Sequence, residues 1–383
     1  MRVFTDILVM PTQGLRNGVG GPGKRGLSGF VRGGPVWPRF ALQIGPRHCR
    51  GFLPFPIDRK PVPMDGPVRT ASCGVWCGPV SPHFGHMIDD FISRVPRSID
   101  EADGMPLVFS LGPDVGLEPK SFFWQILDHL GASRTDVLLV REPTRFGTLR
   151  VFAQEERVGA GPRAHYLDLL DRMTRRSGAR TAPIDTLFVS KALVYDGKLI
   201  GERYLDIVFA KAGAVVIHPE TMTLAEQLDH YRRARTIVFS EGSALHGLQL
   251  LGRLDARVVV LVRREGCTLA RHALRPRVTE LRYWNCITGL IYGCHTHGRP
   301  QLDRALAVFD TADLMRRLEG IGIDLAPHWA DGAYAQAKRA DALSFARYMK
   351  QAALHPQALA MIQDCLDRNR IDLDVRAALE TAQ

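Results

Sequence analysis

The segment 185–262 constrains the fold more than any other part of this 383-residue chain. Four short apolar runs, DTLFVS, AVVIH, TIVFS and RVVVLV, alternate there with stretches that have the apolar spacing of helices. Continuous apolar strands separated by helices are typical of a parallel sheet that is covered on both faces. The segment therefore predicts a Rossmann-like α/β domain.

The loops after these strands are the expected ligand site, because ligands of open parallel sheets bind beyond the carboxyl ends of the strands. The expected helices in between cover 202–212, the residues after the capping box Thr223-Leu-Ala-Glu226, and 243–251. The candidate ligand-binding residues in the loops and helix starts are Lys191, Lys198, Glu202, Glu220, Glu241, Gly242, Ser243 and His246.

A phosphate group is the ligand that this set favours. Backbone amides at a helix start attract phosphate, and lysines add positive charge. The turn at Gly242 and Ser243 supplies such amides, although Ser243 could equally be the cap of an ordinary strand-to-helix turn. Neither GxGxxG nor GxxxxGK[ST] occurs within 185–262, so dinucleotide-binding and P-loop sites lose their main support there.

The rest of the chain divides around this domain. Helix-like and strand-like segments alternate upstream, with strands expected at 107–111, 136–140 and 149–153 and helices at 81–95, 121–130 and 163–177. The sequence predicts a flexible Gly/Pro/Arg-rich tail (1–44), a Rossmann-like N-terminal domain (45–180), a C-terminal Rossmann-like domain (181–300) and a helical segment (301–383).

The sequence GPVSPHFGHMIDDFISR at 78–94 carries the second group of candidate residues. On a helix, Phe84 begins an apolar stripe, while His86 and Asp90 are i, i+4 neighbours on another face and His83 lies near the helix start. A histidine paired with a carboxylate can act as a general base for a hydroxyl. The alternative is that these histidines cap the helix or bond within the core.

With these two motifs the sequence resembles glycosyltransferase family 61, in its bacterial capsular-polysaccharide branch. The family pattern G-x-x-x-x-HFGHFLxE is matched here by GPVSPHFGHMIDD, and the later family motifs are matched over 68–262. Lys191 and Lys198 stand where the family commonly has arginines, and Gly201 where it usually has Asn. A lysine keeps the charge of an arginine but lacks its bidentate geometry.

The resemblance implies a GT-B architecture, with two Rossmann-like domains facing across a cleft and C-terminal helices that pack back toward the N-terminal domain. It also implies an inverting, metal-independent glycosyltransferase of surface polysaccharide synthesis. Such an enzyme transfers a hexosyl, pentosyl or N-acetylhexosaminyl group from a nucleotide sugar, its co-substrate, to a glycan or lipid-linked acceptor. His86, Asp90 and His83 would be catalytic, with His86 or Asp90 as the base, and the loop residues would bind the donor.

Composition limits the partners and the compartment. The formal net charge of +10 comes from dispersed arginines and lysines, which suit a plain basic surface or peripheral contact with an anionic membrane better than a nucleic-acid site. The seven cysteines are scattered, which argues for a reducing compartment. We expect a cytoplasmic protein, with no signal peptide, no membrane-spanning helix and no cofactor.

One further segment contains possible metal ligands. Cys286, Cys294, His295 and His297 have side chains that can bind metal, but their spacing fits no common zinc site, so no bound metal is expected.

Other functions are compatible with the same fold. A nucleotide-sugar epimerase also uses two Rossmann-like halves, and a non-catalytic subunit that binds nucleotide or glycan would need the same fold. Nucleic-acid binding is the third alternative.

Overall fold

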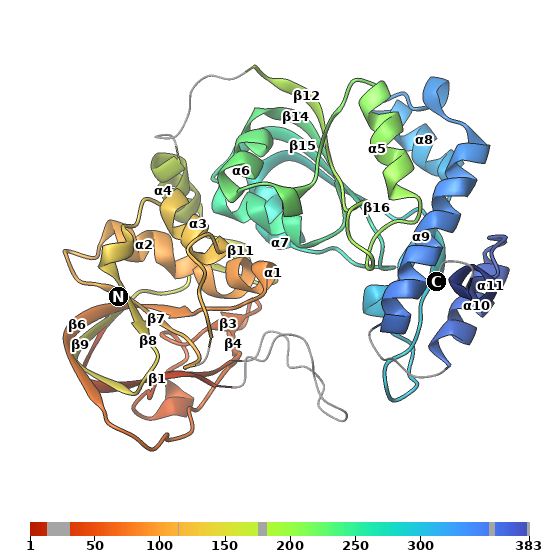
Figure 1. The fold of residues 1–383 in the computed structure, drawn as a ribbon. Helices are drawn as coiled ribbons and strands as arrows, with labels where there is room; N and C mark the ends of the chain where they lie inside the picture. Colours follow the sequence, from red (N-terminus) through yellow and green to blue (C-terminus); the bar gives the residue numbers. More distant parts are fainter. Residues whose placement is uncertain (14–30, 114, 175–181, 352–356, 381–383) are drawn as a thin grey trace.

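The computed structural model describes residues 1–13, 31–113, 115–174, 182–351 and 357–380. Within these ranges the chain is a mixed α/β protein with one large sheet in each half (Figure 1). The N-terminal half is built on seven strands and the C-terminal half on five parallel strands. The C-terminal helices follow the second sheet.

The C-terminal sheet contains the four strands that the sequence predicts. They are β12 (Ile184–Val189), β13 (Val215–Ile217), β14 (Ala234–Ser240) and β15 (Leu254–Leu261), and the fifth is β16 (Val278–Trp284). The order β13-β12-β14-β15-β16 reverses direction at β12, which makes the gap between β12 and β14 the topological switch point. Strand β16 was not expected, because its sequence VTELRYW mixes charged and apolar residues.

Helices α5 (Glu202–Lys211) and α6 (Leu224–Arg233) connect the first three strands, and the predicted capping box of α6 is present. The predicted helix 243–251 is instead the 3₁₀ helix η6 (Ser243–Leu250), so that prediction was wrong in type. A 3₁₀ helix places residues i and i+3 directly above one another. Leu245, Leu248 and Leu251, spaced by three, are all buried, which fits this geometry.

The N-terminal sheet has the order β5-β2-β1-β9-β6-β7-β8. Strands β9, β6, β7 and β8 are parallel, whereas β1 lies antiparallel to both β9 and β2. The strand bounds are β1 (Arg2–Gln13), β2 (Val31–Pro35), β5 (Asp58–Arg59), β6 (Arg69–Pro79), β7 (Leu107–Ser110), β8 (Val137–Val140) and β9 (Thr144–Val151). A mixed sheet of this kind departs from the plain Rossmann-like sheet that the sequence predicts.

The first strand also corrects the prediction of a flexible tail over 1–44. Strand β1 lies between β2 and β9 and buries Ile7, Val9 and Met10, so apolar burial holds it in the sheet. The amide of Thr12, at the end of β1, donates to the carbonyl of Leu111, just beyond β7, at 3.3 Å. Since β9 and β6 lie between these two strands in the sheet order, this bond shows that the sheet curls. Residues 14–30, also part of the predicted tail, lie outside the described residues.

The predicted helix 81–95 is helical but irregular. It consists of α1 (Phe84–His86), a π-helical turn η2 (Met87–Phe91), the 3₁₀ turn η3 (Ile92–Arg94) and α2 (Val95–Asp100). Ile88, Phe91 and Val95 are buried as the apolar spacing predicts. The other helices of this half are α3 (Phe122–His129) and α4 (Ala164–Thr174), close to their predicted bounds.

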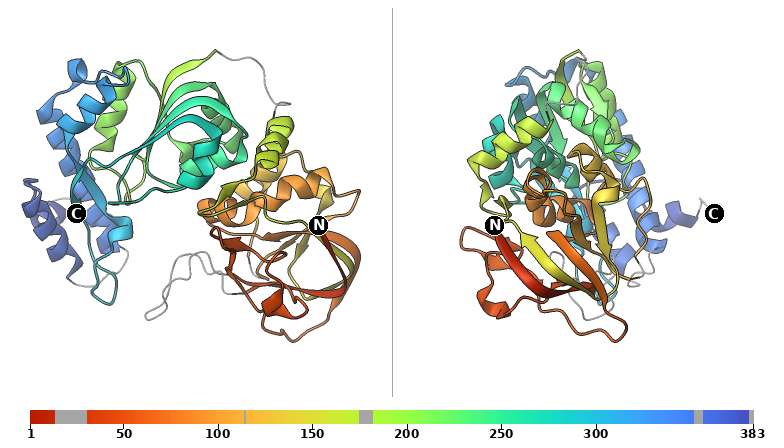
Figure 2. Two further views of the ribbon diagram at one scale, coloured as in Figure 1. Left: turned by 180° about the vertical axis from the view of Figure 1, so that it is seen from behind. Right: turned by 90° about the vertical axis from the view of Figure 1, so that its left-hand side faces the viewer.

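The two halves are in direct contact (Figure 2). Turn η2 packs against η6, α3 packs against α6, and the short strand β11 (Gly161–Pro162) packs against α7 (Arg271–Leu274). The buried apolar cluster runs through both halves and includes Phe91, Leu127 and Leu248. The side chain of Gln125 on α3 accepts the amide of Leu224 at the start of α6, at 2.7 Å.

The C-terminal segment is helical, as predicted, after a short hairpin. Its elements are β17 (Ile287–Ile291), β18 (Leu306–Phe309), α8 (Thr311–Glu319), α9 (Asp331–Gln351), α10 (Ala358–Arg368) and α11 (Val375–Glu380). Helix α9 packs on α5, and the group lies on the side of the C-terminal sheet away from the N-terminal sheet (Figures 1 and 2). The expectation that these helices pack back toward the N-terminal domain was therefore wrong. None of the described helices is both long enough and apolar enough to cross a membrane.

Candidate functional site

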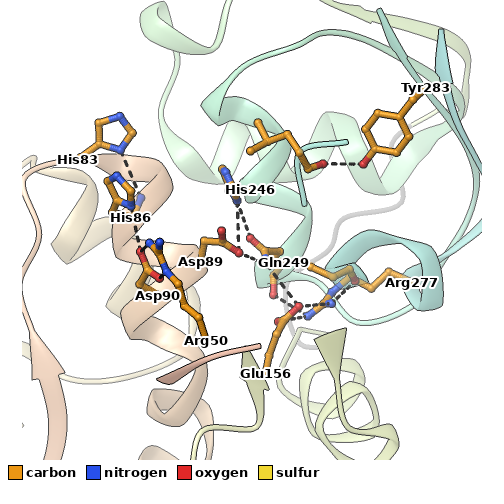
Figure 3. Close-up of polar contacts among 12 residues, drawn as sticks. Arg50, His83, His86, Asp89, Asp90, Glu156, His246, Gln249, Arg277 and Tyr283 are labelled. Atoms are coloured by element: carbon orange, nitrogen blue, oxygen red, sulfur yellow. Dashed lines mark hydrogen bonds and ion pairs between the residues drawn. The ribbon is translucent and has the colours of Figure 1, made fainter. Parts of the chain in front are cut away.

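His86 and Asp90 form the bonded pair that their spacing predicts (Figure 3). The Nδ1 atom of His86 lies 2.9 Å from Oδ2 of Asp90. The carboxylate also accepts two hydrogen bonds from the guanidinium of Arg50, at 2.7 and 2.6 Å. Arg50 belongs to the short hairpin of β3 (Cys49–Arg50) and β4 (Phe55–Pro56), and sequence reasoning gave no signal for it.

The electrostatics separate the roles of the two partners. Burial alone would raise the pKa of Asp90, but the hydrogen bonds from His86 and Arg50 outweigh it and hold the pKa below its ordinary value. Asp90 thus remains a carboxylate whose side chain is fully buried, whereas 30% of the His86 side chain is exposed. The exposed member of the pair is the imidazole.

His83 and His246 complete a group of three histidines. His83 caps the helix by accepting the amide of His86 at 3.3 Å, and the two rings lie 4.8 Å apart between centroids. His246 approaches the same turn from the C-terminal half, because a Cβ on Gly85 would lie 3.1 Å from its ring carbon Cδ2. Burial, followed by the nearby His86 and His246, lowers the pKa of His83. We call His83, His86 and His246 the histidine cluster.

The cluster joins the two sequence motifs that carry the candidate residues. The two motifs at 78–94 and 240–247 were expected to face each other, and the contact between Gly85 and His246 brings them together. His246, predicted among the donor-binding residues, lies beside the predicted catalytic residues. A larger residue at position 85 would press on the His246 ring, which would have to shift by a few tenths of an ångström.

A polar network that sequence reasoning missed lies under His246 (Figure 3). Nδ1 of His246 is 2.8 Å from Oε1 of Gln249. Nε2 of Gln249 donates to Asp89 at 3.1 Å and to Glu156 at 3.3 Å. Glu156 in turn accepts two bonds from the buried guanidinium of Arg277, at 2.9 and 2.7 Å. We call Asp89, Glu156, Gln249 and Arg277 the interface network, because Asp89 and Glu156 belong to the N-terminal half and the others to the C-terminal half.

The edge of the C-terminal sheet beyond β12 and β14 holds Lys191 and the turn at Gly242 and Ser243. The Lys191 side chain packs against Gly242, since a Cβ built on Gly242 would lie only 2.8 Å from Cδ of Lys191. The Lys191 ammonium contacts the carbonyl of Gly197. Burial, with Arg263 as a second cause, lowers the pKa of Lys191 to about 8. Ser243 is half-buried at the start of η6. We call Lys191, Gly242 and Ser243 the switch-point edge.

Three predicted donor-binding residues use their charged groups within the chain. Lys198 donates to Asp341 of α9 at 2.8 Å in a buried pair. Glu202 accepts the amides of Lys191 and Leu199, at 2.7 and 3.1 Å, and its burial raises its pKa to about 7.

The third of these residues is Glu241. Its buried carboxylate accepts the amide of Arg263 at 3.0 Å and Nε of Arg264 at 2.6 Å. Glu220, by contrast, is exposed in η5 (Pro219–Thr221). Donor contacts of these four residues stay a prediction, and the structure gives three of them internal partners instead.

The cysteine- and histidine-containing segment around 286–297 provides no metal site. Within the described ranges no group of three or more His, Cys, Asp or Glu side chains is arranged to hold a metal ion. His295 and His297 stack on each other with ring centroids 5.1 Å apart. Cys294 is buried.

Comparison with known proteins gives one family match over the segment that carries these residues. Residues 84–253 match the family model described as Glycosyltransferase 61. The matched range begins at α1 and ends after η6, so it includes His86, His246 and the switch-point edge. The match supports glycosyltransferase family 61 and, through it, glycosyltransferase activity in general. A search of the curated proteins found no match.

The buried pair of Lys198 and Asp341 yields a test of its structural role. We expect Asp341→Ala to lower the free energy of unfolding by about 3–5 kcal/mol, because it leaves the Lys198 ammonium buried without its partner. The double variant Lys198→Met/Asp341→Leu should lose less, because no charge remains buried. Urea denaturation followed by circular dichroism measures both.

Asp364→Ala is the matched control for this experiment, because Asp364 is an exposed acid on α10. Its unfolding free energy should stay within about 0.5 kcal/mol of wild type. If Asp341→Ala is as stable as this control, the pair does not anchor α9, and Lys198 is free to bind an anion.

Proposed function

We propose that this protein is an inverting glycosyltransferase of GT-B type that transfers a sugar from a nucleotide sugar to a glycan or lipid-linked acceptor in surface polysaccharide synthesis. The observation that carries the proposal is the His86–Asp90 pair. It lies in the segment that matches the glycosyltransferase family, and its neighbour Gly85 contacts His246 from the other half of the molecule. Two α/β halves in contact beside this pair are compatible with the GT-B type that we propose.

His86 is the proposed general base. Its Nδ1–H donates to the Asp90 carboxylate, so that in the neutral ring Nε2 carries the lone pair. Asp90 is a poor candidate for the base, since its side chain is fully buried and Arg50 and His86 already bond its oxygens. These contacts support one of the two roles that the sequence leaves open for each residue: Asp90 orients the ring, and His86 takes the proton.

The reaction then runs as a single displacement. His86 Nε2 removes the proton of the acceptor hydroxyl as its oxygen attacks the anomeric carbon, and the bond from that carbon to the diphosphate oxygen breaks on the opposite face. The electron pair of that bond leaves with the nucleoside diphosphate. Attack opposite the leaving group inverts the anomeric centre.

The leaving diphosphate needs positive charge where its own charge develops. We place it at the switch-point edge, with the Lys191 ammonium and the amides of Gly242 and Ser243 as donors. The position of this edge supports the assignment, since ligands of such sheets bind at the switch point. Of the two predicted phosphate-binding lysines, Lys191 is the one whose ammonium has no hydrogen bond to a carboxylate among the described residues.

Substitution of the pair tests the proposal directly. We expect His86→Ala to lower kcat by about 10²–10⁴-fold, the usual contribution of a general base, while nucleotide binding stays unchanged. Asp90→Asn should also lower kcat, because an amide no longer fixes the Nδ1–H form of His86. A transfer assay with a panel of nucleotide sugars and glycan acceptors, together with calorimetric nucleotide titration, measures both quantities.

His230→Ala is the control histidine, since His230 lies on α6, where its ring bonds the backbone of its own helix. Full turnover in both His86→Ala and Asp90→Asn would reject the mechanism. Release of an epimer without an acceptor would favour the epimerase alternative, and nucleotide binding without any transfer would favour a non-catalytic subunit.

The Lys191 assignment predicts a pH dependence. With a pKa of about 8, the Lys191 ammonium is largely charged at pH 7 and largely neutral at pH 9, so affinity for a nucleoside diphosphate should fall about tenfold over this range. Lys191→Arg should remove this fall, because a guanidinium stays charged throughout. Calorimetric titration of uridine and guanosine diphosphates at several pH values measures the effect.

Lys211→Met is the control, because Lys211 lies exposed at the other end of α5. If Lys191→Met binds nucleoside diphosphates with the affinity and pH profile of this control, the diphosphate does not contact Lys191. The transfer activity could still be real, with the donor bound elsewhere.

We also propose that the protein associates peripherally with an anionic membrane on its cytoplasmic side. The tip of the β3–β4 hairpin exposes 68% of Phe52, 89% of Leu53 and 60% of Phe55. The Phe52 ring packs edge-on to His272, 5.4 Å away between centroids, within a segment whose exposed arginines are Arg271 and Arg275. Exposed apolar residues beside cationic ones suit the interface of an anionic bilayer.

Vesicle sedimentation tests this association. Phe52→Ser/Leu53→Ser should lower the affinity for phosphatidylglycerol vesicles about tenfold, because partial burial of two large apolar side chains is worth at least about 1.4 kcal/mol. Leu302→Ser, at an exposed position of η8 (Leu302–Arg304), is the control. Equal sedimentation of both variants with wild type would mean that the hairpin does not contact lipid.

A further inference from the structure

The hydrogen bonds of the interface network fix which atoms of its members donate and which accept. Glu156 receives two guanidinium N–H groups from Arg277, so its carboxylate is an acceptor toward every neighbour. Gln249 approaches Glu156 and Asp89 with one atom of its amide. Because the Glu156 carboxylate can only accept from it, that atom must be the nitrogen.

The orientation of the Gln249 amide then decides the state of His246. With Nε2 turned to the carboxylates, Oε1 faces Nδ1 of His246 at 2.8 Å. A carbonyl oxygen can only accept, so Nδ1 must carry the hydrogen. In a neutral imidazole the other nitrogen, Nε2, is then a bare acceptor.

Nε2 of His246 lies next to the turn at Gly85. A Cβ on Gly85 would lie 3.4 Å from Nε2 of His246, so this atom borders the turn that carries His83 and His86. Among the described residues, Nε2 of His246 has no hydrogen-bond partner, and 6% of the side chain is exposed. A neutral acceptor in this position suits a sugar hydroxyl and does not suit a phosphate oxygen, which carries no hydrogen.

We propose that contact between the two halves sets His246 as a hydroxyl-accepting residue, through the chain Arg277–Glu156–Gln249–His246. Gln249 is the positioning residue. The chain crosses the interface twice, from Arg277 to Glu156 and from Glu156 to Gln249, so separated halves would leave Gln249 and His246 free to rotate. The hydroxyl that His246 receives belongs to the transferred sugar or the acceptor, and this part rests on the proposed glycosyltransferase function.

The sequence predicts His246 only as a donor-binding residue, and the group that we infer it binds is a hydroxyl. This role differs from the role of His86, whose Nδ1–H is fixed by a carboxylate within its own half. The two rings have equivalent tautomers, with each Nε2 available, but only the tautomer of His246 depends on the interface. Oδ1 of Asp89 lies 3.9 Å from Nδ1 of His246.

Nitrogen NMR of the full-length protein tests this inference without any substrate. With ¹⁵N-histidine labelling at pH 8, long-range correlation spectra separate the Nδ1–H and Nε2–H tautomers, and the spectrum of His246→Gln assigns the signal. We expect Nδ1–H for His246 in the wild-type protein. An Nε2–H signal in the wild type would overturn the inference outright.

Two variants test the chain. Gln249→Leu should shift His246 toward the Nε2–H tautomer, whereas Gln227→Leu should not, since Gln227 bonds backbone carbonyls near the start of α6. Glu156→Leu/Arg277→Leu removes both buried charges together, which avoids leaving one charge unpaired. It should also shift the tautomer, although Gln249 is retained. An unchanged tautomer in the double variant would show that the interface does not set it.

Activity supplies a second readout. Gln249→Leu should lower kcat about 100-fold, as misplacement of a reacting group does, with nucleotide affinity unchanged within about twofold. An Nδ1–H signal together with full activity of His86→Ala would leave the network intact and reject the proposed function. A shifted tautomer with unchanged kcat and KM would reject the role of His246 and keep the glycosyltransferase proposal.

Discussion

The buried pair of Arg277 and Glu156 is the constraint on which the rest of the arrangement depends. Arg277 is fully buried and comes from the C-terminal half, and Glu156 comes from the N-terminal half. Burial of either charge without the other would cost several kcal/mol, so the two halves are held at one relative position. Burial raises the pKa of Glu156 against the influence of Arg277, so the pair carries a desolvation cost that packing elsewhere must offset.

That fixed position explains why the polar groups gather where they do. The π-helical turn η2 brings Asp89 toward the interface and Asp90 toward His86, so two adjacent carboxylates serve two different histidines. Extra residues in a helical turn are frequent at functional sites, because they redirect neighbouring side chains. The 3₁₀ geometry of η6 does the same on the other side, since it stacks His246 over Gln249.

The sequence predicts the C-terminal sheet well, because its strands are buried on both faces and read as uninterrupted apolar runs. It also predicts the bonded His86–Asp90 pair, which depends only on local helical spacing. The edge strand β16, with alternating polar residues, gave no such signal. Arg50, Asp89, Glu156 and Gln249 were missed because their roles come from contacts between distant segments, which periodicity does not encode. For the same reason Lys198 was predicted to bind a ligand, whereas it pairs with Asp341, 143 positions away.

Strand β1 has a consequence for how the chain is made. Arg2 pairs with Val151 and Val9 with Thr144, so β1 meets its second partner, β9, only after more than 130 further residues have been made. Until then its buried face, with Ile7, Val9 and Met10, has no β9 to lie against. Pairing between segments so distant in sequence is slow to form and exposes apolar edges in the meantime. Completion of the N-terminal sheet therefore waits for β9, whereas the C-terminal sheet, whose strands follow one another closely, can assemble as it emerges.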